Sequence, residues 1–252
     1  MPLSEEIARA MKHGELFLNY LPTVSLADAR CLGAEALVRW RRRKVVLPAG
    51  AFIPLIENTP VSGMITYWVI DTVAAELGAW LDDHPDAHLS INVPPEILGR
   101  GGLAYATLHS GLQGRVDQIV LEITERGIPD RLGQEALQAL AKHGVRLALD
   151  DVTLSSTNLA LLMRSDFSIV KLNRELTWQI KPQEPQPTWF EGLAALLKNT
   201  ALEVIAEGVE SEYQADQLRG IGVQMAQGYF YSMPIGAREL MDFYAETSTQ
   251  AS

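Results

Sequence analysis

The chain has 252 residues, 47% of them hydrophobic, and a formal net charge of −10. This length can bury a core of α/β-barrel size. An acidic chain binds DNA and anionic membrane surfaces poorly, so an anionic substrate would need a cation between it and the protein. Cys31 is the only cysteine, which excludes an intrachain disulfide and favours a reducing compartment. With no signal-like N-terminus and no uninterrupted apolar span, the sequence predicts a cytoplasmic domain without a membrane segment.

Apolar periodicity and turn residues predict alternating strands and helices. The chain begins with a helix from Ser4 to a stop at Gly14, a strand at 16–21, a turn at 28–30, a strand at 31–40, a basic loop at 41–44, and helices at 51–57 and 61–81. It continues with strands at 88–93, 118–123, 145–149 and 167–172, and with helices at 103–112, 131–143, 159–164 and 175–180. A loop at 181–187, a helix at 189–198, a strand at 202–206, a helix at 212–219, a strand at 223–226, a helix at 238–244 and a frayed tail at 245–252 complete the prediction.

Eight strands that mostly alternate with helices over this length are typical of a (β/α)8 barrel. The first connection differs, because the short turn at Asp28–Arg30 fits an antiparallel strand pair. We therefore expect one α/β domain over residues 1–252, a modified TIM-like (β/α)8 barrel whose first strand is antiparallel.

Polar side chains gather near the carboxyl ends of the predicted strands, where barrel enzymes build their active sites. Either Asp150 or Asp151 alone could cap the next helix. Capping cannot explain all of the polar residues at these strand ends, because most of them lie within or beside apolar runs. A carboxylate buried in such a run must be paired with a cation or bound to a metal. Histidine is absent from these ends, which favours Mg²⁺ or Mn²⁺ held by oxygen over zinc. The set is Glu35, Asn92, Glu122, Asp150, Asp151, Lys171, Glu207 and Gln227.

The run Glu35-Ala36-Leu37, followed by Val38-Arg39-Trp40, resembles the motif that names the EAL-domain family of cyclic di-GMP phosphodiesterases. The resemblance implies a barrel that hydrolyses one phosphodiester bond of this bacterial second messenger to give linear pGpG. It also implies a homodimer and a sensor domain fused to or regulating the barrel. The similarity covers nearly the whole chain and continues in order through residues 90–92, 121–125, 148–151, 170–171, 206–210 and 227–229.

The same resemblance assigns roles to matching positions. Two Mg²⁺ or Mn²⁺ ions are expected, with Ca²⁺ inhibitory because its looser coordination departs from the geometry of Mg²⁺. Lys171 would hold or deprotonate the attacking water, with Glu207 a further catalytic candidate. Glu125 would anchor the loop after the fifth strand, or serve as a helix N-terminal carboxylate. The implied metal ligands are Glu35, Asn92, Glu122, Asp150, Asp151 and Glu207, with Asp150 bridging.

Substrate contacts are implied at four positions, and two of them, Arg39 and Gln227, have a structural alternative. Arg39 would hold a substrate phosphate, or pair with Glu35 or Glu57. Gln227 would contact a base or lie behind the contacting residues, or it could satisfy a buried backbone group. The four implied contacts are Leu37, Arg39, Glu210 and Gln227.

Three departures from the family pattern leave an alternative open. Residues 152–158 lack both glycines of the family loop, Leu21 replaces a glutamine, and Asn173 replaces an aspartate. The family loop couples metal binding to the dimer interface, so turnover is in question. A catalytically weak or inactive domain that binds cyclic di-GMP as a receptor is therefore the alternative to an enzyme. Retention of every metal-ligand position favours the enzyme.

Overall fold

Strand β1 (Leu16–Ser25) runs antiparallel to both of its neighbours and closes a barrel of eight strands. The computed structural model describes residues 3–124, 130–153, 166–183 and 187–250. Around the barrel the order is β1-β9-β8-β7-β6-β5-β4-β2, and all neighbouring pairs that exclude β1 are parallel. The predicted barrel with an antiparallel first strand is confirmed.

The remaining strands are β2 (Cys31–Arg42), β3 (Val45–Pro48), β4 (His88–Asn92), β5 (Ile119–Thr124), β6 (Arg146–Val152), β7 (Ile169–Leu172), β8 (Glu203–Ala206) and β9 (Met225–Ala226). The α-helices are α1 (Leu3–Lys12), α2 (Pro60–Asp83), α3 (Gly102–Ser110), α4 (Arg131–Lys142), α6 (Arg174–Thr177), α7 (Trp189–Asn199), α8 (Glu212–Gly220) and α9 (Ala237–Gln250). The 3-10 helices in the described ranges are η1 (Ala49–Ala51), η2 (Ile53–Leu55), η3 (Pro95–Ile97) and η4 (Leu112–Gln118).

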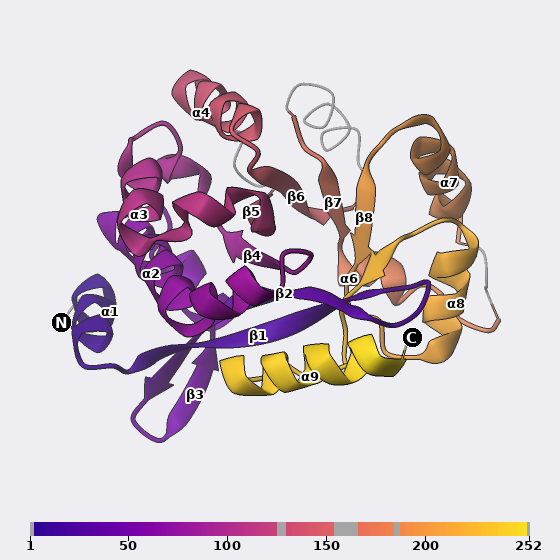
Figure 1. Ribbon diagram of the computed structural model, residues 1–252, viewed down its shortest axis with the longest axis horizontal. Helices are drawn as coiled ribbons and strands as arrows, with labels where there is room; N and C mark the ends of the chain where they lie inside the picture. Colours follow the sequence, from indigo (N-terminus) through magenta and orange to yellow (C-terminus); the bar gives the residue numbers. More distant parts are fainter. Residues whose placement is uncertain (1–2, 125–129, 154–165, 184–186, 251–252) are drawn as a thin grey trace.

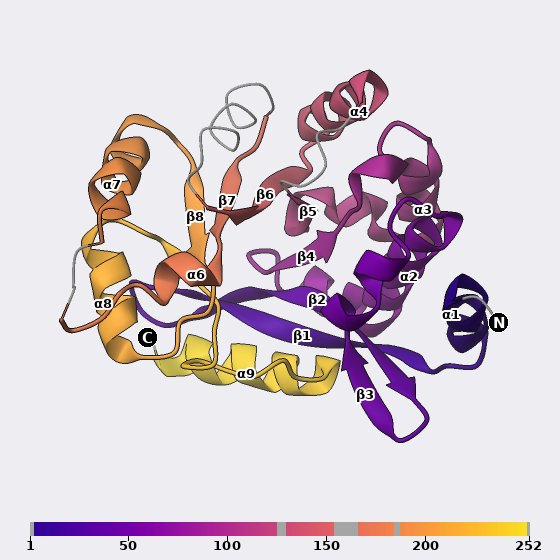
Figure 2. The same cartoon turned by 180° about the vertical axis from the view of Figure 1, so that it is seen from behind.

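Apolar side chains fill both the inside of the barrel and the layer between strands and helices. Helices α2, α3 and α4 lie on one side of the barrel and α7 and α8 on the other, while α9 runs alongside β1 (Figures 1 and 2). Because a barrel of this size is packed with side chains, its interior is a core and any site must lie at a rim. A small inner cluster consists of Val120, Ala148, Ile169, Ile205 and Met225.

The predicted frayed tail at 245–252 is wrong for residues 245–250, which continue helix α9. A tertiary contact explains the extension: the Cys31 N–H of β2 donates a hydrogen bond to Thr247 Oγ1 at 3.0 Å. The serine and threonine side chains of this turn also donate to helix carbonyls, as Ser248 Oγ does to Tyr244 O at 2.8 Å. Polar residues thus extend the helix because packing outweighs their weak helix propensity.

Several element boundaries differ from the prediction. The basic run 41–44, expected as a loop, forms the end of β2 and the turn of a hairpin. The second strand of this hairpin, β3, was not predicted. Strand β1 continues through Pro22. At this residue β1 pairs only with β2, so the strand tolerates a proline, which has no N–H to donate to a second neighbouring strand. Residues 51–57 form 3-10 turns instead of an α-helix. The predicted helix at 159–164 lies outside the described residues. No helix in the described ranges is long and apolar enough to cross a membrane.

Candidate active site

The parallel register brings the polar strand ends together at one rim of the barrel. Asn92 at the end of β4 is paired with Glu122 of β5, and Thr124 of β5 is paired with Asp150 of β6. Because parallel strands present their carboxyl ends at the same edge, residues far apart in the sequence become neighbours. Glu207 follows β8 directly and completes this side of the ring.

The Lys171 ammonium on β7 lies at the centre of the ring and is fully buried. Its Nζ is 2.8 Å from a carboxylate oxygen of Glu122, 2.8 Å from one of Glu207 and 2.9 Å from one of Glu35. A fourth carboxylate oxygen, Asp150 Oδ1, lies at 3.3 Å. Asn92 Nδ2 donates to the other oxygen of Glu35 at 2.8 Å. One cation therefore faces four carboxylates, and we call these five charged residues the acidic ring.

The charges of the ring shift the pKa of its members in opposite directions. Burial alone would lower the pKa of Lys171, but the surrounding carboxylates raise it well above its usual value. Burial alone would raise the pKa of Glu35, but Lys171 and Asn92 lower it. Burial raises the pKa of Glu122 and Asp150, and it raises the pKa of Glu207 to about 7. A single ammonium is thus too little positive charge for four buried carboxylates.

Asp151 is held in an unusual conformation next to the ring. Its φ is +62°, in the left-handed region, at the point where the register between β6 and β7 shifts. Asn173 Nδ2 donates a hydrogen bond to Asp151 Oδ1, while Asn173 Oδ1 accepts from the Glu175 N–H at 2.7 Å. Because the helix N-terminus fixes the amide orientation, Asn173 presents a donor to Asp151. An aspartate at this position would present a second carboxylate instead.

The donor set of the ring fits a hard divalent cation. Carboxylate and amide oxygens are the ligands that Mg²⁺ and Mn²⁺ take in proteins. Glu122 Oε1 is buried and has no hydrogen-bond partner among the described residues, so one ligand oxygen is available. Within the same residues, no three Asp, Glu, His or Cys side chains are already arranged so that they could hold a metal ion. Glu35, Asn92, Glu122, Asp150, Asp151 and Glu207 are the residues that could hold the cations.

The predicted substrate contacts occupy three different environments. Arg39 is half-buried and donates to Val38 O at 3.0 Å; it forms no ion pair with Glu35 or Glu57 in the described part of the chain. Gln227 is buried and its Nε2 donates to Thr23 Oγ1 at 2.9 Å, while its Oε1 has no hydrogen-bond partner among the described residues, so its contact with a substrate base stays a prediction. Glu210 is exposed. Glu125 lies outside the described residues, as do residues 154–158 of the departing loop.

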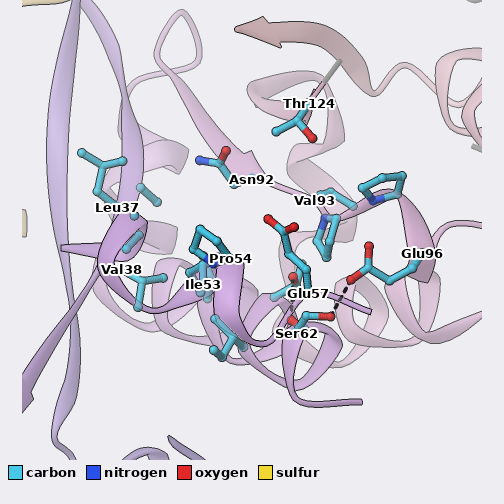
Figure 3. Close-up of a pocket in the computed structure, with 18 of the residues that line it drawn as sticks. Leu37, Val38, Ile53, Pro54, Glu57, Ser62, Asn92, Val93, Glu96 and Thr124 are labelled. Atoms are coloured by element: carbon cyan, nitrogen blue, oxygen red, sulfur yellow. Dashed lines mark hydrogen bonds between the residues drawn. The ribbon is translucent and has the colours of Figure 1, made fainter. Parts of the chain in front are cut away.

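A cavity of about 420 Å³ adjoins the acidic ring and is lined by Glu35 of the ring and by Asn92, which donates a hydrogen bond to Glu35. Leu37, the fourth predicted contact, lies in its wall (Figure 3). The Glu57 carboxylate also lines the cavity and points into it (Figure 3). From the sequence, Glu57 was expected only as a partner for Arg39, because no motif marks it and its position depends on how η2, α2 and β4 come together.

Comparison with family models shows to which family a chain with this barrel and this acidic ring belongs. The model of the EAL domain matches residues 4–234, and the chain belongs to the EAL-domain family. The resemblance noted in the motifs is thereby confirmed. The family match covers β1 to β9 and therefore every residue of the acidic ring.

The chain is similar to curated relatives with related names. It is 29% identical over 236 residues to the probable cyclic di-GMP phosphodiesterase PdeB of Escherichia coli, covering 92% of this chain and 45% of PdeB. It is 28% identical to the cyclic di-GMP phosphodiesterase NbdA of Pseudomonas aeruginosa, covering 96% of this chain and 32% of NbdA. The chain thus spans less than half the length of these relatives.

Solved structures agree with the barrel. The MucR phosphodiesterase structure, a complex with cyclic di-GMP, superposes with a TM-score of 0.84 at 26% identity and covers 95% of this chain and all of that one. The EAL enzyme Bd1971 bound to cAMP and cyclic di-GMP gives a TM-score of 0.82 at 25% identity, covering 96% of this chain and 68% of that one.

Proposed function

We propose that this chain is a divalent-cation-dependent phosphodiesterase that hydrolyses cyclic di-GMP to linear pGpG. The observation that carries the proposal is the acidic ring, in which four carboxylates from four parts of the barrel converge on one lysine. Relatives named as cyclic di-GMP phosphodiesterases support the substrate. Its place in a longer protein with a sensor domain, its homodimeric state and its cytoplasmic location are parts of the same proposal.

The residues of the chain have distinct tasks in this reaction. Two Mg²⁺ or Mn²⁺ ions, when bound, would supply charge for the phosphate and activate water. Glu35, Asn92, Glu122 and Asp150 would hold the first ion, and Asp151 and Glu207 the second, with Asp150 shared. In the cation-free protein the carboxylate neighbours of Lys171 raise its pKa. In the reaction Lys171 would hold the attacking water or deprotonate it.

Positive charge for the substrate would come from Arg39, whose guanidinium has no carboxylate partner among the described residues. A guanidinium fork suits a phosphate, since it can donate two parallel hydrogen bonds. Glu125, Glu210 and Gln227 complete the proposed site as a loop anchor and as residues at or behind the substrate.

One observation favours a second function, a cyclic di-GMP receptor with weak or no turnover. Asn173 already satisfies one oxygen of Asp151 without any cation. A second cation would compete with this hydrogen bond, so its binding would be weaker than at a site with an aspartate there.

A turnover assay separates the two functions. The purified domain is incubated with cyclic di-GMP and Mg²⁺ or Mn²⁺, pGpG is followed by chromatography, and binding is measured in parallel. The enzyme proposal expects pGpG from the wild type and none from Glu35→Ala. Binding without product at high protein concentration would establish the receptor, and activity in Glu35→Ala would contradict its role as a ligand.

A further inference from the structure

The hairpin of β2 and β3 carries a basic cluster that the proposed reaction does not use. Arg41, Arg42, Arg43 and Lys44 follow one another at its tip, in a chain whose net charge is −10. All four residues are exposed. The hairpin projects away from the barrel in both views of the molecule (Figures 1 and 2). The cluster is therefore presented at an extremity of the protein.

The two cations at the turn, Arg43 and Lys44, form no ion pair or side-chain hydrogen bond in the described part of the chain. Arg42 beside them donates two hydrogen bonds of 2.8 Å to the Glu6 carboxylate of α1. These hydrogen bonds, together with the charges of Arg42, Arg9 and Arg43, hold the pKa of Glu6 below its usual value. One carboxylate thus faces three arginines, and the positive charge of the hairpin is left largely uncompensated.

Exposed valines lie directly beside these cations. Val45 and Val46 of β3 are 57% and 49% exposed. Because successive side chains of a strand point to opposite faces, neither face of the hairpin tip is covered by the barrel. Val45 also lines an open hollow of about 290 Å³ together with Leu47, Arg42 and Arg43. Guanidinium groups and apolar walls therefore meet at one place on the surface.

The shape of the hairpin favours one kind of partner over another. Strand β3 lies at the edge of the sheet and pairs only with β2, which in general allows another chain to add a strand. However, β3 has only four residues and ends in Pro48, which has no N–H, so it offers too short a row of backbone groups for strand addition. A bilayer needs no such row, because it takes apolar side chains into its interface and basic side chains against its phosphates.

We propose that the tip of the β2–β3 hairpin, residues 41–46, docks on the surface of an anionic phospholipid bilayer. Arg43 and Lys44 bind lipid phosphates, while Val45 and Val46 enter the boundary between headgroups and acyl chains. The acidic net charge of the chain does not prevent this contact, because exposed charges farther away than a Debye length of about 8 Å are screened at physiological ionic strength. The local charge of the hairpin therefore decides the sign of the interaction.

The test is co-sedimentation of the full chain with vesicles of phosphatidylcholine and phosphatidylglycerol at about 3:1, compared with vesicles of phosphatidylcholine alone. The wild type should bind the anionic vesicles and not the neutral ones, and its binding should weaken as salt is added. Arg43→Gln with Lys44→Gln should weaken binding about 25-fold, since each basic residue near the surface contributes about fivefold. Val45→Ser with Val46→Ser should weaken it about tenfold, because less apolar area enters the interface.

Controls separate docking at the hairpin from a general effect of charge. Lys181→Gln with Lys198→Gln removes two exposed positive charges outside the hairpin and should bind like the wild type. All variants should melt at the wild-type temperature, because the substituted positions are exposed.

Three results would overturn the proposal. The first is no binding to anionic vesicles, or equal binding to anionic and neutral ones. The second is equal binding by the wild type and the Arg43→Gln, Lys44→Gln variant. The third is a dimer in sedimentation velocity that the hairpin variants dissociate, without vesicle binding, which would assign the hairpin to a second copy of the chain. The assay contains no cyclic di-GMP, so its result is independent of the proposed function.

Discussion

Replacing Lys171 by methionine should destabilise the cation-free protein strongly. Among the described residues, the Lys171 ammonium is the only positively charged group that forms an ion pair with the carboxylates of Glu35, Glu122, Asp150 and Glu207. Removing one partner of a buried ion pair costs about 3–5 kcal/mol because the other charge stays buried. For a domain of this size each kcal/mol lowers the melting temperature by about 2–4 °C, so a fall of about 6–20 °C is expected.

The assay is thermal and urea denaturation of Lys171→Met in EDTA and again in Mn²⁺. A cation should restore more stability to the variant than to the wild type, because the ring of the variant has no internal positive charge. Lys198→Met, at an exposed position on α7, serves as the matched control and should stay within about 0.5 kcal/mol of the wild type. Equal stability of Lys171→Met and wild type in EDTA would refute the reasoning.

Two further predictions concern pH and cation binding. Burial lowers the pKa of His88 from 6.5 to about 4. As the pH falls, the unfolded chain therefore binds a proton at this histidine before the folded chain does. The free energy of unfolding, which is highest above pH 6.5 in this respect, decreases as the pH falls towards 4. The expected loss in the free energy of unfolding is about 3 kcal/mol. Urea denaturation at a series of pH values should show this loss in the wild type and not in His88→Gln. The same pH dependence of stability in both proteins would contradict the prediction. Asn173→Asp should raise Mn²⁺ affinity about tenfold by adding a carboxylate beside Asp151, as followed by electron paramagnetic resonance. Unchanged affinity in that variant would mean that Asn173 does not weaken the second site.

The barrel was predictable because its signals are local. Strand and helix periodicities alternate along the chain, and the turn at Asp28–Arg30 is too short for a parallel crossover. Two elements escaped prediction for physical reasons. Strand β3 has only four residues behind a basic run, with Val45 and Val46 exposed. The last turns of α9 are polar and depend on the contact between Thr247 and Cys31.

The composition of the acidic ring was predictable, but its internal pairing was not. Position at a strand end identified Glu122 and Lys171, because carboxyl ends of parallel strands meet at one rim. Which groups pair depends on side-chain direction, which sequence does not specify. Gln227 illustrates this, since it is buried against Thr23. Glu57 was overlooked as a cavity residue because its neighbours there come from η2, α2 and the end of β4.

The most direct test of the central proposal is the initial rate of pGpG formation from cyclic di-GMP as Mn²⁺ is titrated into EDTA-treated protein. A cation site at the acidic ring predicts no product in EDTA, a rate that rises and saturates with Mn²⁺ in the wild type, and no rise in Glu35→Ala. Product formation in EDTA, or the same Mn²⁺ response in Glu35→Ala, would contradict the proposal.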